Sequence, residues 1–194
     1  MTPSTSKRPK QAAGQTPDPI EIQSAALIFK TTRDDHRIAW LAALAISIHI
    51  LESALPSPIP GIKPGLANVI SITVLMLYGW SAASWVTLLR VLVGSIIIGT
   101  FLTPTFMLSL SGAVASLIVL WIAYHLPGKG FGAIGYSLLA SMAHMAGQFF
   151  IAYLIFIPHP GLFRLLPPMM TMAVIFGIVN GIIVNTLIKR LNDT

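Results

Sequence analysis

The sequence has 194 residues, of which 55% are hydrophobic and only 9% are charged. Soluble domains carry about 25% charged residues, so this composition excludes an ordinary water-soluble domain. The net charge of +6 does not indicate a nucleic-acid partner, because the Lys and Arg residues lie mainly at the chain ends and in short connections and form no basic stripe with aromatic residues. The chain has no cysteine, which excludes disulfides, thiol catalysis and Cys-based metal centres.

Residues 1–37 are predicted to form a cytoplasmic tail. Positions 1–19 are rich in Pro, Thr, Ser, Lys and Gln and show no apolar periodicity, so we expect them to be disordered. The apolar stretch 20–29 is interpreted either as a helix in the membrane interface or as a short linker helix.

Residues 38–191 are predicted to form an all-α, polytopic membrane domain. A helix needs about 20 apolar residues to cross a hydrocarbon core about 30 Å thick. Six stretches fit or nearly fit this length, namely 38–55, 66–80, 82–102, 107–125, 134–157 and 168–191. The second is short, and only Gly-Trp-Ser separates it from the third. Five spans with one long bent hairpin are the alternative.

The positive charges predict the orientation of this bundle. Cytoplasmic connections carry the excess of Lys and Arg, and an even number of spans returns both termini to one side. Only Lys63 and Arg164 fall opposite the termini, whereas many basic residues share their side, namely Lys7, Arg8, Lys10, Lys30, Arg33, Arg37, Lys129, Lys189 and Arg190. We therefore expect both termini in the cytoplasm, with connections 56–65, 103–106 and 158–167 facing outward.

Arg90 is a candidate ligand-binding residue because it lies near the middle of the third span. A basic residue at that depth costs about 2.5–3.5 kcal/mol on insertion scales. Either it snorkels toward the membrane interface or bonds carbonyls at the end of a neighbouring helix, or it holds an anionic or carbonyl-bearing ligand. Glu52 is the only carboxylate within a predicted span, so it is a candidate ion partner of Arg90. His49 shares a helical face with Glu52, but these ligands are too few for a zinc site, and no metal is expected.

Polar residues of the fifth and sixth spans are expected to face the bundle interior. His144 and Gln148 form an i,i+4 pair on one face, and Asn180 and Asn185 lie in the last span. They either line a binding cavity or form hydrogen bonds that hold the helices together.

The segment 60–68 contains two prolines and two glycines directly before a membrane helix. Irregular backbone at membrane depth is tolerated where it lines a cavity. We expect Lys63 and Asn68 to cap a solute site that opens outward, with further polar groups beneath them, namely Arg90, His144, Gln148 and Asn180. An ordinary outward hairpin is the alternative.

Small residues suggest helix contacts. Ala39, Ala43 and Ser47 recur every four positions of the first span, where they would let a partner helix approach closely. Gly94 with Gly99 in the third span, and Gly177 with Gly181 in the last, are interpreted as packing positions within the bundle.

Three segments carry a family resemblance: GIKPGLANVISITVLMLYG, LLRVLVGSIIIGTF and SLSGAVASL. Over about 38–190, they resemble the Gx transporter family, also labelled heptaprenyl diphosphate synthase component I, which is similar to the S components of energy-coupling factor transporters. This implies a six-helix, S-component-like subunit of the bacterial cytoplasmic membrane that binds a small solute. It also implies docking on coupling and ATPase subunits, to which Ala39, Ala43 and Ser47 would correspond.

The enzyme label of the same family is tested by the motifs that such chemistry needs. Prenyl diphosphate synthases hold magnesium and diphosphate through aspartate-rich motifs of the DDxxD type, and Asp34-Asp35 is followed by His, Arg and Ile. There is also no GxxxxGK[ST] phosphate loop. We expect no catalytic residues and no cofactor. A non-catalytic membrane component of heptaprenyl diphosphate synthase and a structural membrane protein are the alternatives to a transport subunit.

Overall fold

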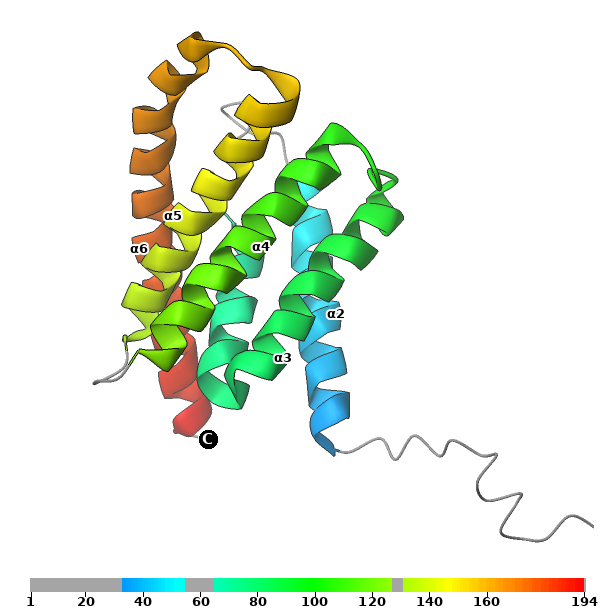
Figure 1. Ribbon diagram of the computed structural model, residues 1–194. Helices are drawn as coiled ribbons and strands as arrows, with labels where there is room; N and C mark the ends of the chain where they lie inside the picture. The colour runs from blue at the N-terminus through cyan, green and yellow to red at the C-terminus, as the bar shows by residue number, and fades with distance from the viewer. Residues whose placement is uncertain (1–32, 55–64, 127–130, 194) are drawn as a thin grey trace, which may run out of the picture. The chain divides into compact units, whose positions relative to one another are not determined.

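The computed structural model describes residues 33–54, 65–126 and 131–193, and the regular structure of these residues is entirely helical. A short π-helix, η1 (Ala152–Phe156), extends α5, and a 3₁₀-helix, η2 (Pro160–Leu165), leads into α6. The long helices run in chain order through α2 (Arg33–Ala54), α3 (Ala67–Ile98), α4 (Pro104–His125), α5 (Ala133–Ile151) and α6 (Leu166–Asn192) (Figure 1). The expected all-α fold is confirmed.

Gly and Pro set several helix ends. α3 ends at Gly99, which adopts a left-handed conformation with φ of 76°, and the amide of Thr100 donates to the carbonyl of Ser95 at 2.8 Å. Such a glycine closes a helix because it carries no Cβ to clash. Pro104 then starts α4 at a position where a missing N–H costs nothing.

The helix α3 folds back on itself at Gly79. Gly79 has φ of 82° and ψ of −175° within an otherwise continuous helix. Asn68 and Arg90 are 22 residues apart, which would separate them by about 33 Å on a straight helix. Instead, the Arg90 Nη2 lies 3.5 Å from the Asn68 Oδ1. The two arms, 67–78 and 80–98, are therefore antiparallel neighbours (Figure 1).

The first arm of α3 is too short to cross a membrane alone. Residues 67–78 rise about 18 Å, against about 30 Å of hydrocarbon. At its turn end, a Cβ built on Gly79 would lie 3.5 Å from the hydroxyl of Tyr124, next to the last residue of α4. The N-terminal end of this arm consequently lies at the depth of the membrane core.

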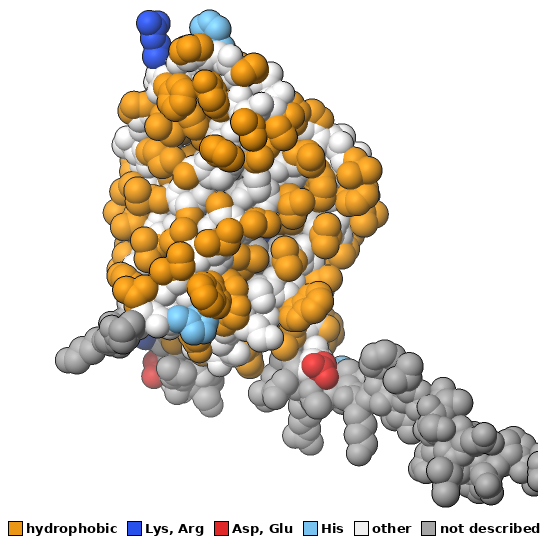
Figure 2. Space-filling model, viewed as in Figure 1, with side chains coloured by type: hydrophobic (Ala, Val, Ile, Leu, Met, Phe, Trp, Pro, Cys, Tyr) orange, Lys and Arg blue, Asp and Glu red, His pale blue; other side chains and the backbone are white. Residues whose placement is uncertain are grey.

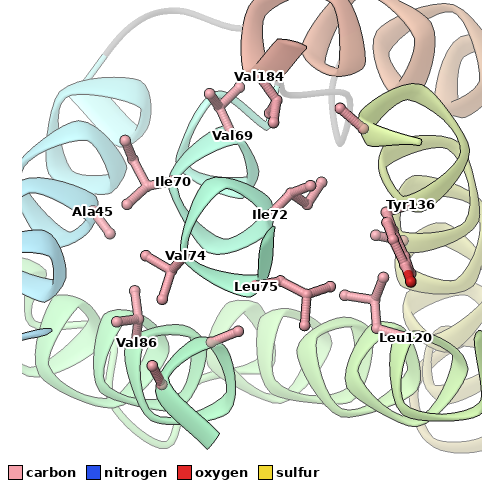
Figure 3. Close-up of a cluster of buried hydrophobic side chains, with 14 of the residues drawn as sticks. Ala45, Val69, Ile70, Ile72, Val74, Leu75, Val86, Leu120, Tyr136 and Val184 are labelled. Carbon is pink, nitrogen blue, oxygen red and sulfur yellow. The ribbon is translucent and has the colours of Figure 1, made fainter. Parts of the chain in front are cut away.

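The first arm is also the centre of the hydrophobic core. All side chains from Asn68 to Leu75 are buried, although neighbours in this run point to different sides of the helix. Figure 3 shows Ile72 and Leu75 facing Leu120 and Tyr136, whereas Val74 points toward Val86 of the second arm. A helix that is buried all round needs apolar residues on every face, which explains the missing amphipathic pattern of this stretch.

Glycines allow the last helices to pack closely. A Cβ on Gly147 of α5 would lie 2.6 Å from the Cβ of Ala115 on α4. A Cβ on Gly181 of α6 would lie 2.6 Å from the Cα of Ile134, and one on Gly177 would lie 3.0 Å from the Cα of Leu138. These distances confirm that Gly177 and Gly181 are packing positions, whereas a Cβ on Gly99 would meet nothing within 4 Å among the described residues, so the expectation for Gly99 is wrong.

The surface is that of a membrane protein. Figure 2 shows hydrophobic side chains over the height of the visible face, with Lys, Arg, Asp and Glu only near its two ends. Trp85, Ile96 and Phe150 are each at least 60% exposed. Among the described residues, 4 stretches are long and apolar enough to cross a membrane, namely Asn68–Ile98, Pro104–His125, Ala133–Phe156 and Pro160–Leu191, and a shorter apolar helix covers Ile38–Ser53. The chain is thus a multi-pass membrane protein.

The predicted spans match the helices closely. The break expected at Gly-Trp-Ser is the reversal at Gly79, so the first of these stretches contains the segments predicted as the second and third spans, of which the second is too short to cross a membrane alone. α2 begins at Arg33, five positions before residue 38, where the first span is predicted to begin. The helix suggested at 20–29 and the turn at 60–64, which includes Lys63, lie outside the described residues.

We expect the substitution Gly79→Asn to destabilise the protein by about 1–3 kcal/mol, because the backbone conformation at Gly79 is almost restricted to glycine. The matched substitution Gly99→Asn places the same side chain in the left-handed helical region, which Asn tolerates, and should cost much less. Unfolding of the purified variants in detergent measures the difference. Equal losses at the two sites would contradict the role assigned to the Gly79 reversal.

Candidate functional site

A cavity of about 330 Å³ lies between α2, both arms of α3, α4 and α5. It is bounded by the N-terminal end of the first α3 arm, including Gly65 and Asn68. Its side walls carry apolar groups from α3, α4 and α5, such as Val91, Phe106 and Met145. Polar side chains with hydrogen-bonding or charged groups converge on it from four segments of the bundle, namely His49, Glu52, Asn68, Arg90, His144 and Gln148.

Glu52 caps the first arm of α3. Its side chain is only 7% exposed, and its Oε1 accepts a hydrogen bond from the amide of Leu66 at 2.6 Å. The first amides of a helix have no partner within the helix, and a carboxylate there is favoured by the helix dipole. Glu52 therefore ties the end of α2 to the start of α3, a role that the sequence analysis did not assign to it. No local pattern signals it, because the two residues are 14 positions apart.

Asn180 holds the same helix start from the side of α6. Its Nδ2 donates to the carbonyl of Gly65 at 3.3 Å, and its side chain is 2% exposed. Asn180 faces the bundle interior as predicted, but it is not among the residues that line the cavity. Asn185, expected to face inward as well, is exposed, so that expectation is wrong. It lies two turns from the C-terminal end of α6, where Lys189 and Arg190 are also exposed.

Arg90 is buried inside the protein and does not reach toward lipid. It is 5% exposed, and its Nη2 donates to the Asn68 Oδ1 across a long 3.5 Å distance. Within the described ranges, the Arg90 Nε has no hydrogen-bond partner. The structure thus brings together Arg90 and Asn68, two of the predicted site residues, at the end of the short arm.

His144 and Gln148 form one wall of the cavity as a bonded pair. Their Nε2 atoms lie 3.0 Å apart. A Cβ on Gly112 of α4 would lie 2.8 Å from the His144 ring and 2.9 Å from the Gln148 Cγ, so this glycine makes the space for both side chains. His49 packs against Gly94 in the same way, with 2.8 Å from a built Cβ to the His49 Cδ2.

Among the residues that the structure describes, no group of three or more His, Cys, Asp or Glu side chains is placed to hold a metal ion.

The predicted docking residues Ala39, Ala43 and Ser47 are all exposed, whereas Ala42 and Ala45 of the same helix are buried in the core. This row of small residues, the α2 stripe, therefore lies on the outside of the bundle.

Sequence reasoning missed Ser95, Thr100 and Thr105 as cavity residues, because isolated hydroxyls in membrane helices carry no distinct signal.

Comparisons with known proteins agree with this architecture. The family model described as "Heptaprenyl diphosphate synthase component I" matches residues 41–187, and the chain belongs to this family. A solved structure of the S component of a bacterial ECF transporter has a TM-score of 0.57 and 16% sequence identity to this chain. The match covers 81% of this chain and 96% of that one, which shows the same fold. The comparison with curated proteins gives no match.

We expect Glu52→Ala to lower the free energy of unfolding by about 0.5–2 kcal/mol, because the Leu66 amide loses its cap inside the bundle. Ser53→Ala is the control, since the Ser53 hydroxyl donates to the Ile50 carbonyl of its own helix. Both are compared by unfolding in detergent. Unchanged stability of Glu52→Ala would show that the Glu52 contact does not hold the arm.

Proposed function

Because the chain belongs to this family and shares the fold of an S component, we propose that it is the solute-binding subunit of a membrane transporter. The observation that carries the proposal is the cavity of about 330 Å³, which gathers polar side chains from α2, α3, α4 and α5 inside an otherwise apolar bundle. Small-molecule sites are typically concave, largely apolar, and supplied with a few convergent polar groups. The size and lining of this cavity support capture of a small solute.

The proposed orientation lets the solute enter from outside the cell. The cavity reaches Thr100 and Thr105, which flank the connection between α3 and α4, and Glu52 and Ser53 at the end of α2. The positive charges assign these connections to the outer face and both termini to the cytoplasm of a bacterial cell. The cavity would then lie in the outer half of the membrane, where it can receive a solute.

No covalent chemistry is proposed for this site. The sequence has neither the aspartate-rich motif of a prenyl synthase nor a phosphate loop of the GxxxxGK[ST] kind. Energy for release into the cell would come from coupling and ATPase subunits, as the name of an ECF transporter component suggests. The exposed α2 stripe is the proposed docking face, because small residues allow a partner helix to approach closely.

A second candidate function follows from the description of the family. The chain would then be a non-catalytic membrane component that accompanies a soluble heptaprenyl diphosphate synthase. The two candidates predict different partners in a pull-down from native membranes. Coupling and ATPase subunits support transport, whereas a soluble, aspartate-rich prenyltransferase whose activity rises on association supports the second candidate. If neither partner is recovered, a structural role is favoured.

We expect Ser109→Phe to abolish solute retention by filling the cavity, which Ser109 lines from α4. Native mass spectrometry of the protein purified in mild detergent should show a small bound molecule on the parent chain and none on this variant. Ser81→Phe, at an exposed position of the second α3 arm, is the matched control and should keep the molecule. If a folded Ser109→Phe protein retains the same molecule, the cavity is not the capture site.

We expect Ala43→Phe to reduce recovery of the ATPase module at least about tenfold, corresponding to about 1.4 kcal/mol, because a large ring prevents close helix approach on the α2 stripe. Ala146→Phe on the exposed side of α5 is the control. Both variants should retain the solute. Equal recovery of partner subunits by the two variants would place docking elsewhere.

A further inference from the structure

We infer that the solute carries a carboxylate or phosphate group that is bound by Arg90, and an apolar body that lies among Val91, Phe106 and Met145. This inference rests on the proposed capture of a solute and names its chemical class. It is carried by the unfilled hydrogen-bonding capacity of Arg90, which lines the cavity.

The Arg90 guanidinium is a charge with too few partners. It offers five N–H donors. The described residues supply one hydrogen bond, the 3.5 Å contact to Asn68, and leave the Nε without any. A buried cation normally has an ion partner and satisfied donors. An anionic group in the cavity would complete this set through the paired hydrogen bonds that arginine makes with carboxylate and phosphate.

The negative charge of Glu52 does not take the place of an anionic group from the solute. Glu52 and Arg90 are close enough for their charges to attract each other. The Glu52 Oε1, however, is committed to the Leu66 amide at 2.6 Å, at a helix end that carries about half a positive charge from the helix dipole. The helix end and Arg90 together therefore exceed the single negative charge of Glu52, which leaves the site favourable for an anion.

The rest of the cavity favours an apolar body. Val91 lies one residue beyond Arg90, Phe106 is 5% exposed on α4, and Met145 follows His144 on α5. Leu108 and Ile98 extend the same apolar lining. Most of the surface that faces the cavity is apolar, although Ser95, Thr100, Thr105 and Ser109 add hydroxyl groups to it. A molecule with one anionic group and an apolar body fits this lining better than a uniformly polar one.

The test compares matched probes on the purified protein in detergent. One set contains carboxylic acids and their primary amides, and the other contains monophosphate esters and their parent alcohols, all with hydrophobic bodies. Binding is measured by the change in unfolding temperature, followed through tryptophan fluorescence. The acids or the phosphates should bind at least about tenfold more tightly than their neutral counterparts, as expected for a charge-assisted hydrogen-bonded pair. The set that shows this preference distinguishes carboxylate from phosphate.

The variant Arg90→Gln keeps amide donors but removes the charge, so its preference for anions should fall to about one. Arg164→Gln removes an exposed cation on η2 and should leave the preference unchanged. Equal binding of charged and neutral probes by the parent chain would overturn the inference, and this comparison does not require Arg90→Gln to fold. Persistence of the preference in folded Arg90→Gln would overturn it as well.

The outcomes also separate this inference from the proposed function. Neutral probes that bind the parent chain and are excluded by Ser109→Phe would leave solute capture intact and overturn the anionic class. A phospholipid found by native mass spectrometry in place of a small solute, and lost in Ser109→Phe, would support an anionic ligand of Arg90 and contradict the capture of a small solute. The absence of any binder in either probe set, together with no retained molecule, would contradict both proposals.

Discussion

The start of the first α3 arm, at the depth of the membrane core, is the constraint on which the site depends. A helix begins with amides that have no partner within the helix, and in a lipid environment these amides need partners from the protein. The reversal at Gly79 limits this arm to 67–78, and its start lines the cavity. Glu52 accepts a hydrogen bond from the Leu66 amide, while the Gly65 carbonyl accepts from the Asn68 amide and from Asn180. Backbone geometry thus brings a carboxylate into the interior.

The same short arm accounts for the position of the cavity. A helix of about 18 Å fills little more than half of a hydrocarbon core of about 30 Å. Beyond its start, the described part of the bundle leaves a space that Gly65 and Asn68 bound at one end and that α2, α4 and α5 enclose. Gly94 and Gly112 let His49 and His144 reach the walls of this space. One shortened helix therefore produces both the polar anchor and the room for a solute.

Sequence predicted the features that depend on local composition. Apolar runs located the helices, the Gly-Trp-Ser break located the reversal, and the position of Arg90 within a span marked it as unusual. The capping role of Glu52 could not be predicted, because it joins positions separated by an irregular stretch of chain. The exposure of Asn185 was also missed, since hydropathy gives depth but not the side of a helix that faces outward. Lys63 stays a prediction, because it lies outside the described residues.

The two buried charges differ in what the fold does for them. Glu52 has a short hydrogen bond and a helix dipole to offset its desolvation, so its presence follows from the architecture alone. Among the described residues, Arg90 donates one long hydrogen bond to Asn68 and is attracted by Glu52, and its Nε has no partner, although a buried cation without adequate partners is destabilising. A residue that served folding alone would be replaced by an apolar one at no loss, because apolar groups of similar volume often stabilise such positions. The cost of Arg90 is therefore better explained by an interaction that the folded chain does not itself complete.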